Sequence, residues 1–166
     1  MATPGLGMGS QPLTNLVEQK LRAERLVKVG AGWFVTIAAL SMINSVLSMS
    51  GVGIRFIFGL GIAELVDGLA HQAGQTGFAL DLIINGFVAG VFVVFWAFAR
   101  KGEQWAFIVG MALYALDAVV MLYFKQVLSV AFHAYALYRM YSGMSGIPAL
   151  QRVQQAMAPA APIEPR

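Results

Sequence analysis

The sequence predicts an all-α protein: an integral membrane bundle of about five helices with four or five crossings, preceded by a short N-terminal interfacial helix. Of the 166 residues, 58% are apolar and only 11% are charged, whereas a soluble domain carries about 25% charged residues. Apolar runs of about 20 residues, the length that spans a hydrocarbon core of about 30 Å, recur along the chain. Cysteine is absent, which excludes disulfide frameworks, thiolate metal sites and cysteine nucleophiles.

The two ends of the chain are expected to lie outside the bundle. Residues 1–12 are rich in glycine and proline and are predicted to form a flexible tail. Over 13–28 the apolar residues recur at helical spacing, which predicts an amphipathic helix in the membrane interface; a solvated basic flank is the alternative. Residues 144–166 are rich in proline and alanine and are predicted to be a second tail.

The bundle itself is predicted over 29–143, in five segments. They cover 29–49, 54–71, 78–99, 104–124 and 127–141. The boundary between the last two holds no glycine or proline. A single helix over 104–142 would nevertheless reach about 58 Å, too long for a bilayer. We therefore predict a turn at Lys125 and Gln126.

The number of crossings depends on the second segment. If all five segments cross, lysine and arginine divide evenly between the two sides. If 54–71 is re-entrant or interfacial, most of them fall on one side, as the positive-inside rule favours. A weak internal repeat, offset by 73 residues, aligns Phe34 with Phe107 and Asn44 with Asp117. It would invert the second hairpin, as in many transporters, although membrane composition alone also accounts for the match.

Polar side chains occur inside the predicted spans. An aspartate at the centre of a span costs about 2.5–3.5 kcal/mol on insertion scales, so such groups should be neutralised, paired or close to water. Asp67 and Asp81 lie near segment ends and suit the interface. The complete intramembrane polar cluster that we predict is Asn44, Glu64, Asp67, His71, Asp81, Asn85, Tyr114, Asp117 and His133.

Two parts of this cluster have spacings that suggest chemistry. Glu64, Asp67 and His71 share one helical face, but a metal site needs three or four converging ligands, so we predict a polar seam and no metal. Asp117 and His133 are expected to pair across two helices. A carboxyl group and an imidazole inside lipid can share a proton, which serves either a static hydrogen bond or a proton relay.

Gly86 and Gly90 form a GxxxG spacing, which allows two helices to approach closely. This face either binds another copy or a partner, or packs within the chain. No nucleotide-binding loop and no catalytic motif of a known type is present. We therefore expect no enzymatic activity, no cofactor and no nucleic-acid partner. The net charge of +3 comes from lysines and arginines at helix ends, whose expected partner is the lipid bilayer.

A resemblance to known proteins rests on two stretches of the sequence. They are WAFIVGMALYALD at 105–117 and FHAYALY at 132–138. With them, region 100–143 resembles a group of small uncharacterised bacterial multi-pass membrane proteins. The resemblance implies the bacterial inner (plasma) membrane. It implies no substrate, cofactor or catalytic residue.

Three functions remain open from the sequence. The leading hypothesis is a non-enzymatic accessory or scaffold subunit of a membrane assembly, with homo- or hetero-oligomeric membrane partners. The alternative is a small transporter or a proton or cation conduit that uses Glu64, Asp117 and His133. The third is pigment or haem binding through His133 or His71.

Overall fold

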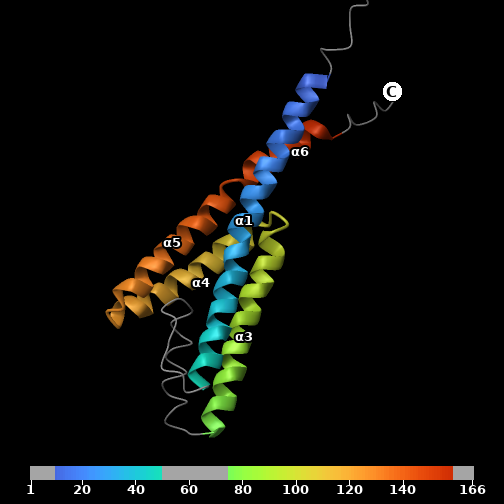
Figure 1. The fold of residues 1–166 in the computed structure, drawn as a ribbon. Helices are drawn as coiled ribbons and strands as arrows, with labels where there is room; N and C mark the ends of the chain where they lie inside the picture. Colours follow the sequence, from blue (N-terminus) through green and yellow to red (C-terminus); the bar gives the residue numbers. More distant parts are fainter. Residues whose placement is uncertain (1–9, 50–74, 159–166) are drawn as a thin grey trace, which may run out of the picture.

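The computed structural model describes residues 10–49 and 75–158, and every regular element in these two ranges is an α-helix. Figure 1 shows two long helices side by side, with a helical hairpin leaning away from them. The predicted all-α helical bundle is therefore confirmed. The helices are α1 (Ser10–Met49), α3 (Gln75–Ala99), α4 (Gln104–Tyr123), α5 (Val127–Met144) and α6 (Ile147–Met157).

Three of the described helices contain stretches that are long and apolar enough to cross a membrane. These stretches are Leu13–Leu47, Leu82–Ala99 and Gln104–Tyr123. Large apolar side chains such as Ile83, Phe87 and Leu116 are exposed on them. Helices that are apolar on their outer as well as their inner face suit lipid, because an aqueous surface would leave these side chains in water. The predicted segment 54–71 lies outside the described residues.

α1 joins two elements that the sequence predicts as separate. Its 40 residues make a rod of about 60 Å, roughly twice the thickness of a hydrocarbon core. The predicted interfacial helix over 13–28 is instead the first half of this continuous helix. The helix continues through Gly30 because that glycine packs directly on Gly143 of α5, and because Ala23 and Val27 just before it are also buried.

α6 lies within the region that the sequence predicts as a proline- and alanine-rich tail. Pro148 occupies the first turn of the helix, where its fixed φ and missing N–H cost nothing. Ile147, Leu150 and Val153 form a buried stripe and pack with the first half of α1. The prolines that suggested a tail therefore include one that starts a helix.

The core of the bundle is aromatic and centres on Phe34 of α1. Its ring lies 6.1 Å from that of Phe92 and 6.0 Å from that of Phe95 on α3, and 5.8 Å from that of Phe107 on α4. Gly110 of α4 faces the same ring, and a Cβ there would collide with it. One phenylalanine thus holds three helices together, and the glycine makes room for it.

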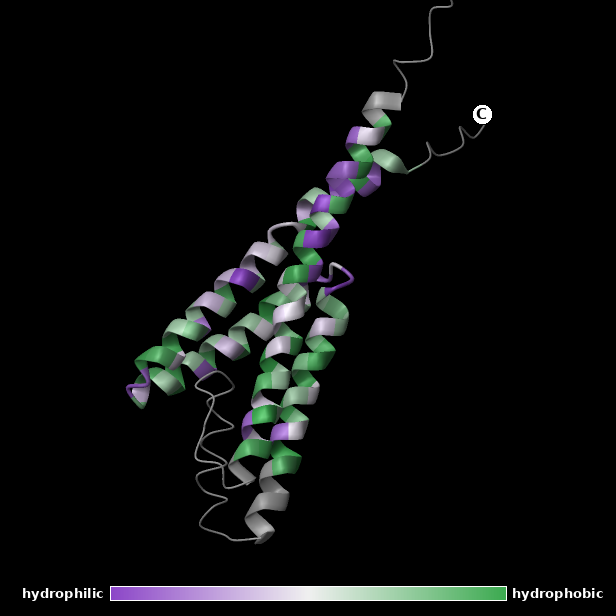
Figure 2. Ribbon diagram, viewed as in Figure 1, coloured by the Kyte–Doolittle hydropathy of each residue, from purple (hydrophilic) through white to green (hydrophobic). Residues whose placement is uncertain are grey.

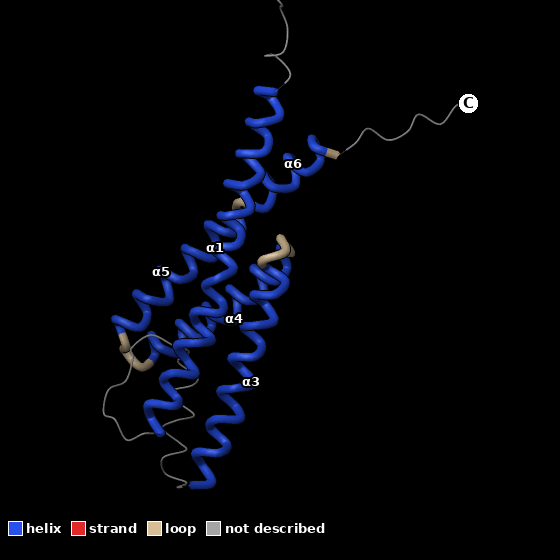
Figure 3. The backbone as a smooth tube through the Cα atoms, turned by 45° about the vertical axis from the view of Figure 1, so that its right-hand side comes forward, coloured by secondary structure: helices blue, strands red, loops and turns tan. Residues whose placement is uncertain are grey.

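Two short turns connect the later helices. Gly102 adopts a φ of 90° between α3 and α4, a conformation that glycine accepts without strain. Lys125 adopts a φ of 56° between α4 and α5, which places the chain reversal at the predicted position. α4 and α5 consequently form an antiparallel hairpin, which Figure 3 shows diverging from α1 and α3.

The helix directions correct the expectation of an inverted repeat. α1 and α4 both begin at the same end of the bundle and run towards the other end (Figure 1). The two repeat-related residues, Phe34 and Phe107, face each other from helices of the same direction. The described parts of the two halves are therefore not inverted, and the structure gives no support to a transporter-like inverted repeat.

The charged residues gather at the end where α1 and α4 begin, as the hydrophilic colours in Figure 2 show. α1 ends and α3 begins at the opposite end of the bundle (Figure 1). Of the nine lysines and arginines in the described ranges, eight lie in or beside the hollows around the first half of α1, and Lys125 lies in the turn between α4 and α5. The eight are Lys20, Arg22, Arg25, Lys28, Arg100, Lys101, Arg139 and Arg152.

Candidate functional site

The central polar contact joins α4 and α5. Nε2 of His133 lies 2.9 Å from Oδ2 of Asp117, and Nδ1 of His133 lies 2.7 Å from the backbone oxygen of Ser129. The histidine side chain is fully buried, and that of Asp117 is 6% exposed. The hairpin turn at Lys125 brings these two residues to the same level on facing helices. The pairing expected from the sequence is present.

The contacts of His133 determine where its protons lie. A carbonyl oxygen only accepts hydrogen bonds, so Nδ1 must donate its N–H to Ser129. Nε2 and Asp117 then share one proton in either of two ways: a protonated carboxyl group donates to neutral Nε2, or Nε2–H donates to the carboxylate. Removing this proton would set a carboxylate against a lone pair. The geometry therefore fits a single proton held in the hydrogen bond between Nε2 and Asp117.

Tyr114 completes this site on α4. Its ring stacks on that of His133, with 4.3 Å between the ring centroids and 17° between the planes. Tyr114 is fully buried, and its hydroxyl has no hydrogen-bond partner among the described residues. Tyr114 thus covers one face of the imidazole ring.

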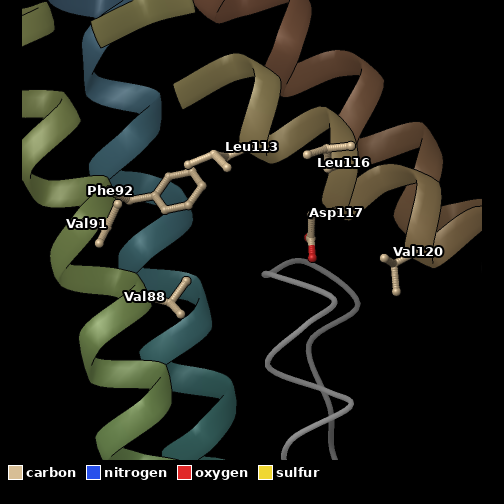
Figure 4. Close-up of a pocket in the computed structure, with 7 residues that line it drawn as sticks. All are labelled: Val88, Val91, Phe92, Leu113, Leu116, Asp117 and Val120. Carbon is tan, nitrogen blue, oxygen red and sulfur yellow. The ribbon is translucent and has the colours of Figure 1, made fainter. Parts of the chain in front are cut away.

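A hollow of about 350 Å³ opens beside the pair, between α3 and α4. Figure 4 shows Asp117 pointing into it. Six of the seven lining residues are apolar, and Asp117 is the polar one. The lining comprises Val88, Val91, Phe92, Leu113, Leu116, Asp117 and Val120. The polar side of this hollow is therefore limited to the carboxyl group of Asp117.

A second polar contact joins α1 and α3, further from the charged end. The side-chain amide of Asn85 donates to the hydroxyl oxygen of Ser45 over 2.7 Å, and both residues are buried. Asn44, which the sequence places in the same cluster, is half-buried on α1. The predicted cluster is therefore divided into at least two separate contacts, one in each pair of antiparallel helices.

The remaining predicted polar residues are not placed by the structure. Glu64, Asp67 and His71 lie outside the described residues, as does the side chain of Asp81. Among the described residues, no three histidine, cysteine, aspartate or glutamate side chains converge as metal ligands. Both ring nitrogens of His133 are engaged in hydrogen bonds, so coordination of a haem iron by this residue would break one of them.

The close glycine contact of the fold differs from the one that the sequence suggested. Among the described residues, no atom lies within 4 Å of a Cβ added to Gly86 or Gly90. Gly30 and Gly143 instead form the tight crossing of α1 and α5, where a Cβ on Gly143 would lie 2.5 Å from Cα of Gly30. These two glycines are 113 positions apart and form no local motif, so only the fold brings them together.

Comparisons with protein-family models, with curated proteins and with solved structures find no match to this chain.

Proposed function

We propose that this protein is a non-enzymatic, multi-pass subunit of the bacterial inner membrane that acts as an accessory or scaffold component of a membrane assembly. One observation carries the proposal: no described residue covers the GxxxG face of α3. Within the ranges 10–49 and 75–158, nothing lies within 4 Å of a Cβ added to Gly86 or Gly90, although such glycines are the usual means by which membrane helices approach closely.

The open glycines line a shallow apolar groove of about 360 Å³ between α1 and α3. Every lining residue is apolar, and several are small: Val35, Ala38, Ala39, Met42, Gly86, Ala89, Gly90 and Val93. In lipid, helix association depends on such close van der Waals packing and not on hydrophobicity. The groove therefore suits a membrane helix better than it suits a polar ligand.

We take a second copy of the chain to be the occupant. Ile83, Phe87 and Val94 are exposed and share the outer face of α3 with the two glycines. The protruding apolar side chains and the glycines thus lie on the same helix face. A contact between two identical surfaces related by a two-fold axis requires this arrangement. If both copies have the same orientation in the membrane, α3 crosses its equivalent near Gly90, and other subunits of the assembly join this dimer.

The internal polar contacts support a structural role. Asp117 pairs with His133 and Asn85 with Ser45, each between neighbouring helices of one chain. The contact at Asp117 borders an apolar hollow and no continuous row of polar groups among the described residues. The positive-inside rule assigns the end with eight basic residues to the cytoplasm.

Cysteine cross-linking tests the proposed face, because the chain has no cysteine of its own. Phe87→Cys in native membranes is expected to give a disulfide-linked dimer on mild oxidation. Leu116→Cys, equally apolar and exposed on α4, is the matched control and should remain monomeric. Adding Gly90→Leu to Phe87→Cys should abolish the dimer. Equal cross-linking at both cysteines, or none at Phe87→Cys, would contradict the proposal.

A proton or cation conduit is the second candidate, and the buried Asp117–His133 pair favours it. A shared proton that can reside on either group is the element that a relay needs. Reconstituted protein with a proton gradient would then show flux that Asp117→Asn removes and that Glu64→Gln also reduces. Flux at the level of empty vesicles would exclude this candidate and leave the structural role.

A further inference from the structure

A hollow lined by three arginines lies between the first half of α1 and the end of α5. Its volume is about 460 Å³, and its lining consists of Arg22, Arg25, Leu26, Val29 and Arg139. The hollow lies beside the tight crossing of α1 and α5 at Gly30 and Gly143. The backbone of Leu26 and of Arg139 contacts this crossing, so the two helices hold the arginines in place. No carboxylate is part of the lining.

A second hollow adjoins the first on the side of α6. The two share Arg22 and Leu26, and the second adds Arg152. Its lining likewise contains no acidic residue: Gln19, Arg22, Ala23, Leu26, Ala149, Arg152 and Val153. Four arginines from three helices thus surround one continuous surface with apolar residues between them, at the charged end visible in Figure 2.

The described chain leaves most of this positive charge uncompensated. Arg22 forms an ion pair with Glu18 at 3.6 Å, but both side chains are largely exposed, so the pair is weak. No ion pair involves Arg25 or Arg139 among the described residues. Nε of Arg139 is buried and has no hydrogen-bond partner there. On the opposite face of α1, by contrast, Glu24 pairs with both Lys20 and Lys28.

A membrane position with Met49 at one face brings the arginines to the depth of the lipid headgroups at the other face. Arg25 precedes Met49, the last residue of α1, by a helical rise of about 36 Å, slightly more than a hydrocarbon core of about 30 Å. Tyr138 and Tyr141, which are exposed near the end of α5, provide the aromatic side chains typical of a membrane interface. A ligand in the hollow would therefore meet the guanidinium groups at the interface and the apolar helix surfaces below it.

We propose that the hollow between α1 and α5 binds the phosphate group of an anionic glycerophospholipid through Arg22, Arg25 and Arg139. Guanidinium groups bind phosphate oxygens in a bidentate manner, and basic hollows between membrane helices suit lipid headgroups. Leu26 and Val29 extend the lining with apolar surface, which suits the start of an acyl chain. This proposal is independent of whether α3 forms a dimer.

The test compares two double variants. Each removes two positive charges, and the two pairs lie beside opposite faces of α1. Arg25→Gln with Arg139→Gln removes two of the three arginines of the proposed site. Arg100→Gln with Lys101→Gln removes two charges from the hollow that Glu24 and Lys28 also line, and serves as the control. Each purified protein in neutral detergent is titrated with phosphatidylglycerol, and its lipid-dependent rise in Tm and its lipid-bound fraction by native mass spectrometry are measured.

The parent is expected to show saturable binding of phosphatidylglycerol and none of phosphatidylcholine. The site variant should bind roughly 10- to 30-fold more weakly, since each of the two arginines near the surface contributes about a fivefold factor. The control variant should change by roughly threefold or less, as expected for screened charges. Arg139→Lys keeps the charge but loses the bidentate geometry, and should give an intermediate loss.

Equal losses in both double variants, or no loss in the site variant, would overturn the proposal. Titrations with inorganic phosphate and with glycerol 3-phosphate distinguish a lipid ligand from a free phosphate. If either compound gives the same rise in Tm as phosphatidylglycerol, the lipid assignment is wrong. Circular dichroism of each variant without lipid ensures that a folded protein is compared. If Arg139→Gln fails to fold, Arg25→Gln with Arg139→Lys gives the decisive titration.

Discussion

The crossing of α1 and α5 makes a strong prediction about a single methyl group. A Cβ added to Gly30 would collide with Cα of Gly143 and lie 2.9 Å from its nitrogen and 3.2 Å from the carbonyl oxygen of Arg139. All three atoms belong to the backbone, so no side chain can move aside. Gly32, two residues further along the same helix, has no atom within 4 Å of an added Cβ and provides the matched control.

The expected magnitude follows from these contacts. Carbon atoms pack at about 3.5–4.0 Å, whereas a Cβ on the other glycine, Gly143, would lie 2.5 Å from Cα of Gly30. The helices would have to separate by about 1 Å, and overpacking of this kind costs about 1–3 kcal/mol. Alanine also gains about 1 kcal/mol over glycine in a helix, and this gain is common to Gly30→Ala and Gly32→Ala. We therefore expect Gly30→Ala to be about 1–3 kcal/mol less stable than Gly32→Ala.

Unfolding by SDS titration in a mild detergent, followed by tryptophan fluorescence, measures this difference. Trp33 reports on the crossing, because its ring lies 5.3 Å from that of Tyr135 and 6.2 Å from that of Phe132 on α5. Two variants of equal stability would refute the reasoning, since the glycine contact would then carry no packing constraint.

Three further results are expected. Asp117→Leu and His133→Leu should each destabilise the protein by about 1–3 kcal/mol, because each leaves a buried polar partner unpaired, and the double variant should lose less than the sum; additive losses in the same SDS titration would contradict the pairing. Leu150→Asp should detach α6 from α1, seen as faster hydrogen exchange over 147–157, because an aspartate cannot be buried there unpaired; unchanged exchange would argue against the docking. Lys101→Cys and Lys125→Cys should react with a membrane-impermeant maleimide from opposite sides of a sealed vesicle, and labelling from one side would contradict the membrane arrangement.

Local signals in the sequence were sufficient for part of this fold. Long apolar runs indicated the helices, and the length limit of a bilayer placed the turn near Lys125 even without a glycine or proline. The Asp117–His133 pair could also be predicted from the sequence. Two polar residues on consecutive antiparallel helices, at matching distances from a turn, must lie at the same level. These features depend on residues that are close in sequence.

Other features depend on contacts between distant residues and left no local pattern. The sequence predicts separate helices over 13–28 and 29–49, whereas the continuous α1 follows from the contact of Gly30 with Gly143. The GxxxG spacing of Gly86 and Gly90 could not show whether its face points inward or outward. The arginine hollow joins residues on α1 to Arg139 of α5, so no single stretch of sequence reveals it.

The tautomer of His133 tests the central claim most directly, namely that the polar groups of this bundle are paired with each other inside it. The measurement is ¹⁵N NMR of the imidazole in bilayers, using His71→Gln so that His133 is the only remaining histidine. We predict a protonated, slowly exchanging Nδ1 that donates to Ser129, and an Nε2 signal that shifts when Asp117→Asn is added. An unprotonated Nδ1 in a rapidly exchanging ring that does not respond to Asp117→Asn would contradict the account.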